Sequence, residues 1–119
     1  MLRQSPGRWL QIIGVAHTAI GIPLYGAELR GIVRDGIVDT VPDHGERAAA
    51  FWYLTAGPGM WLAGRLLRSA ERSDDVAAQR VAGGFVAATG AAGALLMPRS
   101  GFWALAAVGA TAFRRAGHR

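Results

Sequence analysis

The sequence contains no cysteine and no lysine, and few of its side chains are acidic. Its 119 residues include thirteen basic residues, all of them arginine, and eight acidic ones. Without cysteine, disulfide bonds, thiolate metal sites and cysteine nucleophiles are excluded. The chain also lacks a Walker loop, a dinucleotide-binding glycine fingerprint and the HExxH, GxSxG and EF-hand patterns. No motif therefore points to nucleotide, zinc or calcium binding, or to serine hydrolysis.

The excess of arginine gives the chain a pI near 11.3, which on its own would fit a nucleic-acid-binding protein. The arginines, however, stand at the ends of apolar runs and form no stripe with interleaved aromatic residues. Arginine in that position is typical of the flanks of membrane helices. We therefore expect a membrane as partner and no nucleic acid.

Four long runs contain no Asp, Glu, Lys or Arg. They are Trp9–Ala27, Ala48–Gly64, Val81–Pro98 and Ser100–Phe113, with 19, 17, 18 and 14 residues. A membrane-spanning helix needs roughly 20 mainly apolar residues. The mean hydropathy of +0.22 is low for a membrane protein, and a soluble bundle rich in alanine and glycine is the alternative. Run length and arginine placement favour an all-α fold, a bundle of four transmembrane helices.

The predicted helices span about 9–27, 47–67, 78–97 and 101–115, with a polar loop at 28–46. Because 119 residues suffice for one modest core, all four belong to a single domain, 1–119. Nine arginines lie on the side of the two termini and four on the side of the loop. By the positive-inside rule, both termini are expected in the cytoplasm and the loop outside.

Two local patterns stand out in the polar loop. Asp35-Gly36 lies between the β-branched pairs Ile32-Val33 and Ile37-Val38, which predicts either a two-stranded hairpin or a compact Ω-like excursion. Further on, Asp43 followed three residues later by Glu46 predicts a capping box at the start of the second long helix. These local roles are alternatives to any chemical role for the same carboxylates.

Small residues predict close helix packing. Gly14, His17 and Gly21 share one face of the first helix, so we expect this face to point into the bundle. The third helix contains the spacing of tight helix contacts three times, in Gly84/Ala88, Ala87/Ala91 and Gly90/Ala94. Such contacts would join helices of one chain or of a homo-oligomer.

His17 is the ionisable group expected deepest in the bundle. One interpretation makes it a core histidine bonded to Thr55 or to the Leu54 carbonyl, which Pro58 frees from its helical hydrogen bond. The others are a general acid–base, a proton relay or an axial haem ligand. We expect no cofactor and no metal, with haem at His17 as the alternative.

The candidate site joins this histidine to the loop above it. The candidate acid–base residues are His17, Asp35, Asp39, Asp43, His44 and Glu46. The candidate substrate-binding residues are Tyr25, Phe51, Trp52, Tyr53, Thr55 and Thr89. Carboxylates at the mouth of a dry pocket can act as general acids, and the aromatic residues suit an apolar ligand.

Several segments support a resemblance to a known family. They are His17-Thr18, Gly31–Gly36, Glu46–Tyr53 and Met97–Trp103. Together they resemble a family of small bacterial four-helix membrane proteins defined as a domain of unknown function. The resemblance implies the fold and a place in the bacterial inner membrane, but no activity. The layout is more distantly similar to the DoxX-like proteins and to styrene oxide isomerase, a haem-bearing membrane enzyme.

These observations lead to two hypotheses about function. The first is an integral membrane protein that binds or transforms an apolar small molecule or lipid, as an isomerase, a cyclase or an epoxide-opening enzyme without a cofactor. Its pocket would lie among the first three long helices, with His17 at the floor and the loop as lid. The second is a non-enzymatic subunit or small transporter. Small multidrug exporters match in size, but they need a glutamate in the first helix, and this chain has none there.

Overall fold

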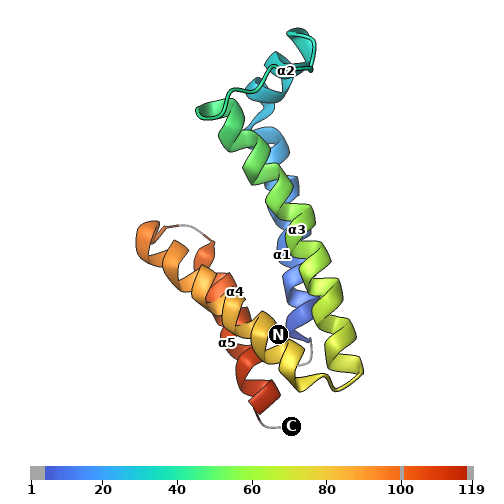
Figure 1. Ribbon diagram of the computed structural model, residues 1–119. Helices are drawn as coiled ribbons and strands as arrows, with labels where there is room; N and C mark the ends of the chain where they lie inside the picture. The colour runs from blue at the N-terminus through green and yellow to red at the C-terminus, as the bar shows by residue number, and fades with distance from the viewer. Residues whose placement is uncertain (1–4, 100, 118–119) are drawn as a thin grey trace. The chain divides into compact units, whose positions relative to one another are not determined.

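The computed structural model describes residues 5–99 and 101–117, and within them the chain is all-α, with five helices and no strand. The helices are α1 (Pro6–Leu24), α2 (Gly26–Arg34), α3 (Glu46–Arg72), α4 (Val76–Leu96) and α5 (Phe102–Gly117) (Figure 1). The all-α prediction is therefore confirmed. The four predicted helices correspond to α1, α3, α4 and α5, and α2 is an additional helix.

The chain divides into two compact units. The loop unit is Ile13–Trp61, and the terminal unit combines Met1–Ile12 with Leu62–Arg119. The division falls inside α1 and α3, so each of these helices contributes to both units.

In the terminal unit, α4 and α5 pack as an antiparallel pair through small residues (Figure 1). A Cβ added at Gly83 would lie 2.6 Å from the backbone nitrogen of Phe113, and one added at Gly90 would collide with the backbone of Ala106. Only hydrogen at these positions allows so close an approach. Of the three predicted pairs, Gly90/Ala94 is buried, whereas Ala88 and Ala91 are exposed and Gly84 is half-buried.

In the loop unit, α1 and α3 lie side by side (Figure 1). A Cβ at Gly14 would be 2.5 Å from the carbonyl oxygen of Gly57, and one at Gly21 would be 2.7 Å from the Tyr53 ring. His17, between the two glycines in sequence, also contacts α3. The prediction that this face of the first helix meets another helix is confirmed.

The polar segment after α1 differs from its prediction. The first helix ends at Leu24 rather than near residue 27, and α2 then occupies most of the first half of the expected loop, bent by 67° from α1. Ile32-Val33 belongs to α2, so the hairpin prediction is wrong in this part of the chain, although Asp35-Gly36 does form a turn. Ile37 and Val38 are 62% and 86% exposed and have no strand to pair with.

The predicted capping box is also wrong. Helix α3 begins at Glu46, which is its first residue rather than the third residue after a cap. The residue before it is Gly45, at φ 105°, and the Gly45 carbonyl accepts the first helical hydrogen bond from Ala49. A positive φ of this size suits glycine. Asp43 is exposed in the preceding turn.

The distribution of side-chain size is unusual for a small helical protein. Small residues and glutamines fill much of the interior, among them Ala50, Ala94, Ala112, Gln11 and Gln79. Among the residues that the structure describes, twenty large hydrophobic side chains are exposed, including Phe85 and Leu95 on α4. By length and composition, no single described helix is sufficient to cross a membrane, and only α1 and α2 taken together as a bent pair meet that test.

Candidate functional site

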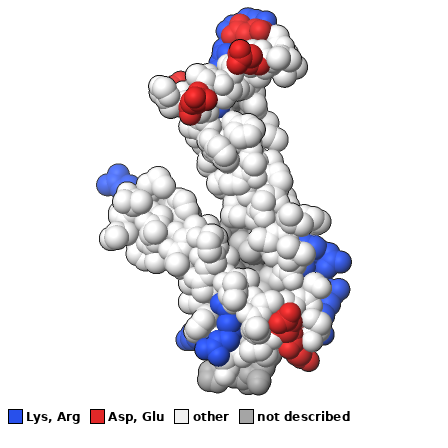
Figure 2. Space-filling view, in the orientation of Figure 1, with Lys and Arg blue, Asp and Glu red and all other residues white. Residues whose placement is uncertain are grey.

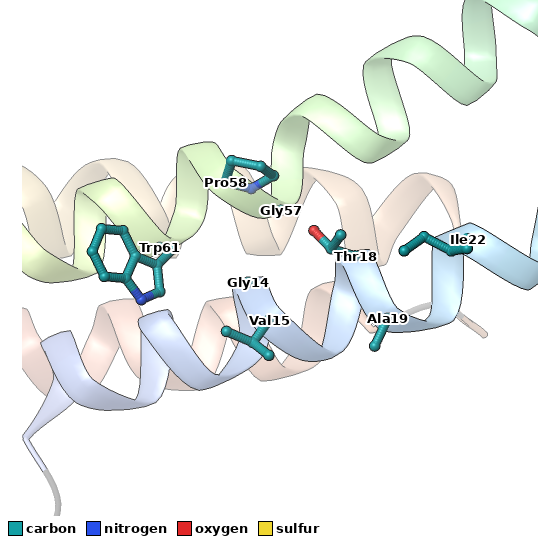
Figure 3. A pocket seen from close by; sticks show the side chains of 8 residues that line it. All are labelled: Gly14, Val15, Thr18, Ala19, Ile22, Gly57, Pro58 and Trp61. Atoms are coloured by element: carbon teal, nitrogen blue, oxygen red, sulfur yellow. The ribbon is translucent and has the colours of Figure 1, made fainter. Parts of the chain in front are cut away.

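A groove runs along the α1–α3 pair in the loop unit (Figure 3). Its volume is about 450 Å³, within the usual range of ligand pockets. The lining residues come from one stretch of each helix: Gly14, Val15, Thr18, Ala19, Ile22, Gly57, Pro58 and Trp61. Apart from the Thr18 hydroxyl and the Trp61 indole nitrogen, these side chains consist of hydrocarbon, so the groove suits an apolar occupant.

The floor of the groove forms where glycines of the two helices face each other. Gly14 on α1 and Gly57 on α3 are both buried, and a side chain on either would meet backbone of the other helix. The Thr18 hydroxyl lies against Gly57, which keeps this polar group in the helix contact (Figure 3). Pro58 and Trp61 then form the α3 wall.

His17 lies outside this groove and is held by Tyr53. The two rings are stacked, with centroids 3.7 Å apart and an interplanar angle of 17°. The Nε2 atom of His17 donates to the backbone carbonyl of Tyr53 at 2.9 Å. The bonding partner is thus neither Thr55 nor the Leu54 carbonyl, and the Thr55 hydroxyl donates instead to the carbonyl of Phe51.

The aromatic candidates separate into two groups. Tyr25 joins the His17–Tyr53 stack, with its ring centroid 5.3 Å from that of Tyr53. Phe51 and Trp52 contact each other edge to face but are 51% and 67% exposed. Of the six candidate binding residues, the structure therefore brings only Tyr25 and Tyr53 together with His17.

In the polar segment, Arg47 organises the chain around Asp35. Its Nη2 donates to Asp35 Oδ2 at 2.7 Å, and its Nη1 donates to the carbonyl of Thr40 at 3.0 Å. Its guanidinium also lies against Gly31 of α2, where an added Cβ would be only 2.6 Å from Nη2. The hydrogen bond from Arg47 lowers the pKa of the Asp35 carboxyl, and the charges of Arg47 and Arg34 act in the same direction. The Asp35 carboxylate thus pairs with Arg47 and links the turn after α2 to the first turn of α3.

The remaining acid–base candidates are not brought together. Asp39, Asp43, His44 and Glu46 are all exposed. Thr89 is exposed on α4 and belongs to the terminal unit, whereas the other candidates belong to the loop unit. Within residues 5–99 and 101–117, no three His, Asp or Glu side chains are grouped so that they could hold a metal ion.

Sequence reasoning missed the lining of the groove. Val15, Ala19 and Ile22 follow helical spacing on α1, next to the face of Gly14 and His17. The sequence did contain a sign of the groove: Gly14 in the first helix can pair with Gly57-Pro58 in the second long helix, and Trp61 follows one turn later. Small residues that let two helices touch leave a depression beside the larger side chains that follow them.

Comparison with known proteins gives one informative result. The family described as "Family of unknown function (DUF6463)" matches residues 1–119. No curated protein and no solved structure matches the chain.

Proposed function

The chain belongs to the family of unknown function DUF6463, and on that premise we propose that it is a membrane protein that binds an apolar small molecule or a lipid chain in the α1–α3 groove. The main observation in favour is the lining of the groove, whose side chains are hydrocarbon except at Thr18 and Trp61. A hydrocarbon occupant would gain roughly 25 cal/mol for each Å² of apolar surface removed from water. In a bilayer the hydrocarbon is already out of water, so its binding would depend on how well its shape fits the groove.

The exposed surface supports a membrane location. Large apolar side chains face outward on every long helix, while buried positions are largely Ala, Gly and Gln. This arrangement is typical of helices packed in lipid, where small residues form the contacts and polar side chains join helices. Within the loop unit, charged side chains are confined to residues 28–47, and Figure 2 shows the charges gathered at the end that holds α2. As in the sequence-based expectation, we place both termini in the cytoplasm of a bacterial cell.

Binding is better supported than acid–base catalysis. No titratable side chain lines the groove, and the imidazole of His17 is engaged by Tyr53. Asp35 is paired with Arg47 in the polar segment. An isomerase, cyclase or epoxide-opening enzyme would need a proton donor at the bound molecule, and the groove itself contains none.

The absence of cysteine makes the membrane orientation directly testable. Single substitutions Asp43→Cys and Ser73→Cys introduce one thiol each, in exposed segments on opposite sides of the proposed membrane. A membrane-impermeant maleimide applied to intact bacterial spheroplasts should label Asp43→Cys but label Ser73→Cys only after permeabilisation. Equal labelling of both variants in intact spheroplasts, or recovery of the protein in the soluble fraction, would refute the proposed location.

The groove is tested separately with a photoreactive hydrocarbon. A diazirine-bearing fatty acid, irradiated with the purified protein, should label Val15 and Ile22 more than Ile20, which is equally exposed but lies outside the groove. Ala19→Trp should fill the groove and abolish this preference, whereas Ile20→Trp, on the same helix but outside the groove, should preserve it. Uniform labelling of all exposed apolar side chains would show that the groove is not a binding site.

A further inference from the structure

A cluster of four arginines lies in the terminal unit, where α1 begins and α3 ends. Arg65, Arg68 and Arg72 are spaced i, i+3 and i+7 on α3, which places them on one face, and Arg8 comes from the first turns of α1. Figure 2 shows basic side chains gathered over the last turns of α3. We call these four residues the arginine cluster.

Arg68 is held in place by contacts with α1. Its Nη1 donates to Oε1 of Gln11 at 3.0 Å, and Gln11 is only 7% exposed. Its side-chain stem packs on Gly7, where an added Cβ would be 2.6 Å from the Arg68 Cγ. A guanidinium oriented in this way loses little conformational entropy when it binds a ligand.

Beside Arg68 lies a recess of about 220 Å³, lined by Ser5, Arg68, Glu71 and Arg72. The single acid in this lining faces the N-terminus of α1, because Glu71 Oε2 accepts from the backbone nitrogen of Gly7 at 3.5 Å. The hydroxyl oxygen of Ser5 accepts from the backbone nitrogen of Arg8 at 3.1 Å. The Glu71 carboxylate is thus directed to the N-terminus of α1, which is the positive end of that helix's dipole.

The cluster has more arginines than acids around it: the charge of Glu71 acts on Arg68, but so do the like charges of Arg72, Arg8 and Arg65. Among residues 5–99 and 101–117, the guanidinium groups of Arg65 and Arg72 have neither a hydrogen bond nor an ion pair. Like charges held this close destabilise the fold unless an anion lies among them. An external anion would relieve this repulsion and supply acceptors for the free N–H groups.

We infer that Arg68 and Arg72 bind the phosphate group of an anionic phospholipid in this recess. Guanidinium groups bind phosphate oxygens through paired, charge-assisted hydrogen bonds, for which their planar fork is suited. Arg65 directly follows the uncharged run Ala48–Gly64, so in the proposed membrane the cluster lies at headgroup level. The inference rests on the proposed membrane location but not on the occupancy of the α1–α3 groove.

The test is a lipid titration of the full-length protein in a neutral detergent, followed by native mass spectrometry. Phosphatidylglycerol should bind at least about tenfold more tightly than phosphatidylcholine. Arg68→Gln with Arg72→Gln should remove this preference, because each charge-assisted hydrogen bond contributes about a tenfold change in affinity. Arg68→Lys with Arg72→Lys keeps the charge but loses the fork, and should retain only part of the preference.

The control variant combines Arg99→Gln with Arg114→Gln, which removes the same charge from exposed positions outside the cluster. It should keep the full preference for phosphatidylglycerol. An equal loss of preference in both double variants would show a general effect of charge and refute the specific site. Displacement of the lipid by millimolar inorganic phosphate would refute the lipid as the source of the phosphate. A membrane-bound protein without lipid preference refutes this site alone, whereas a soluble protein refutes the proposed function as well.

Discussion

His17 lies flat against Tyr53 and donates a hydrogen bond to the backbone carbonyl of the same residue, with 3.7 Å between the ring centroids and 2.9 Å between Nε2 and the oxygen. One side chain of α1 is thus held twice by one residue of α3. The stack and the hydrogen bond make His17 part of the contact between α1 and α3. Its Nε2 atom is occupied by the Tyr53 carbonyl, and His17 does not line the apolar groove.

The first prediction is that His17→Ala lowers stability. The substitution removes an aromatic contact and a hydrogen bond, so the free energy of unfolding should fall by about 1–3 kcal/mol. His17→Phe keeps the stack and should recover about half of that loss. Thermal unfolding of the purified variants measures both effects. A His17→Ala protein that unfolds like the wild type yet has lost its cellular function would instead establish a chemical role for the histidine.

The second prediction concerns the glycine contact beneath the groove. Gly14→Ala should push α1 and α3 apart, because its Cβ would meet the Gly57 carbonyl at 2.5 Å and the Trp61 nitrogen at 2.8 Å. Overpacking of this kind typically costs about 1–3 kcal/mol. The matched control is Gly59→Ala on α3, whose added Cβ has no atom within 4 Å. That variant should gain up to about 1 kcal/mol from helix propensity, and equal behaviour of the two in thermal unfolding would contradict the structure.

The third prediction is an acid-labile polar segment. The bond from Arg47 lowers the pKa of Asp35 in the folded state, so its stabilising effect is complete above the unfolded-state value of about 4 and is lost as pH falls through the lower folded value. Because Asp35 is exposed, the effect is modest and salt-sensitive. The protection of residues 35–46 against hydrogen exchange, relative to the intrinsic rate at each pH, should fall below about pH 4, and Asp35→Asn should show low protection already at neutral pH. Protection that stays constant as the pH falls in the wild type would show that the Asp35–Arg47 pair does not stabilise this segment.

The long helices could be predicted because uncharged runs between arginines determine where they lie. The predicted spans 47–67 and 78–97 lie close to α3 and α4, whose bounds are Glu46–Arg72 and Val76–Leu96. The inward face of α1 also followed from the spacing of Gly14 and Gly21. Each of these features depends on the spacing of residues near one another in the sequence, which can be read from one sequence alone.

The polar segment and the groove depend on contacts between residues distant in sequence. The β-branched pair Ile32-Val33 favours a strand, but in the structure both residues belong to helix α2. Gly31 of the same helix lies against Arg47, sixteen positions later in the sequence. The volume of the groove depends on how closely Gly14 approaches Gly57. Neither distance follows from composition or periodicity. The candidate carboxylates are close in sequence, but the structure pairs only Asp35 among them, with arginines.

The last prediction tests whether the small-residue face of α4 serves the chain itself or an oligomer. Gly90 is buried against Ala106 of α5, where an added Cβ would collide with backbone, whereas a Cβ at Gly84 would lie 3.7 Å from the Phe113 ring, an ordinary contact. Gly90→Ala should therefore lower the unfolding temperature of the isolated protein at every concentration, because the contact lies within one chain. Gly84→Ala should leave it unchanged or raise it slightly through helix propensity. If Gly90→Ala instead altered the oligomeric state in size-exclusion chromatography and left unfolding unchanged, this face would join two copies, and a role as an assembling subunit would then be better supported than ligand binding.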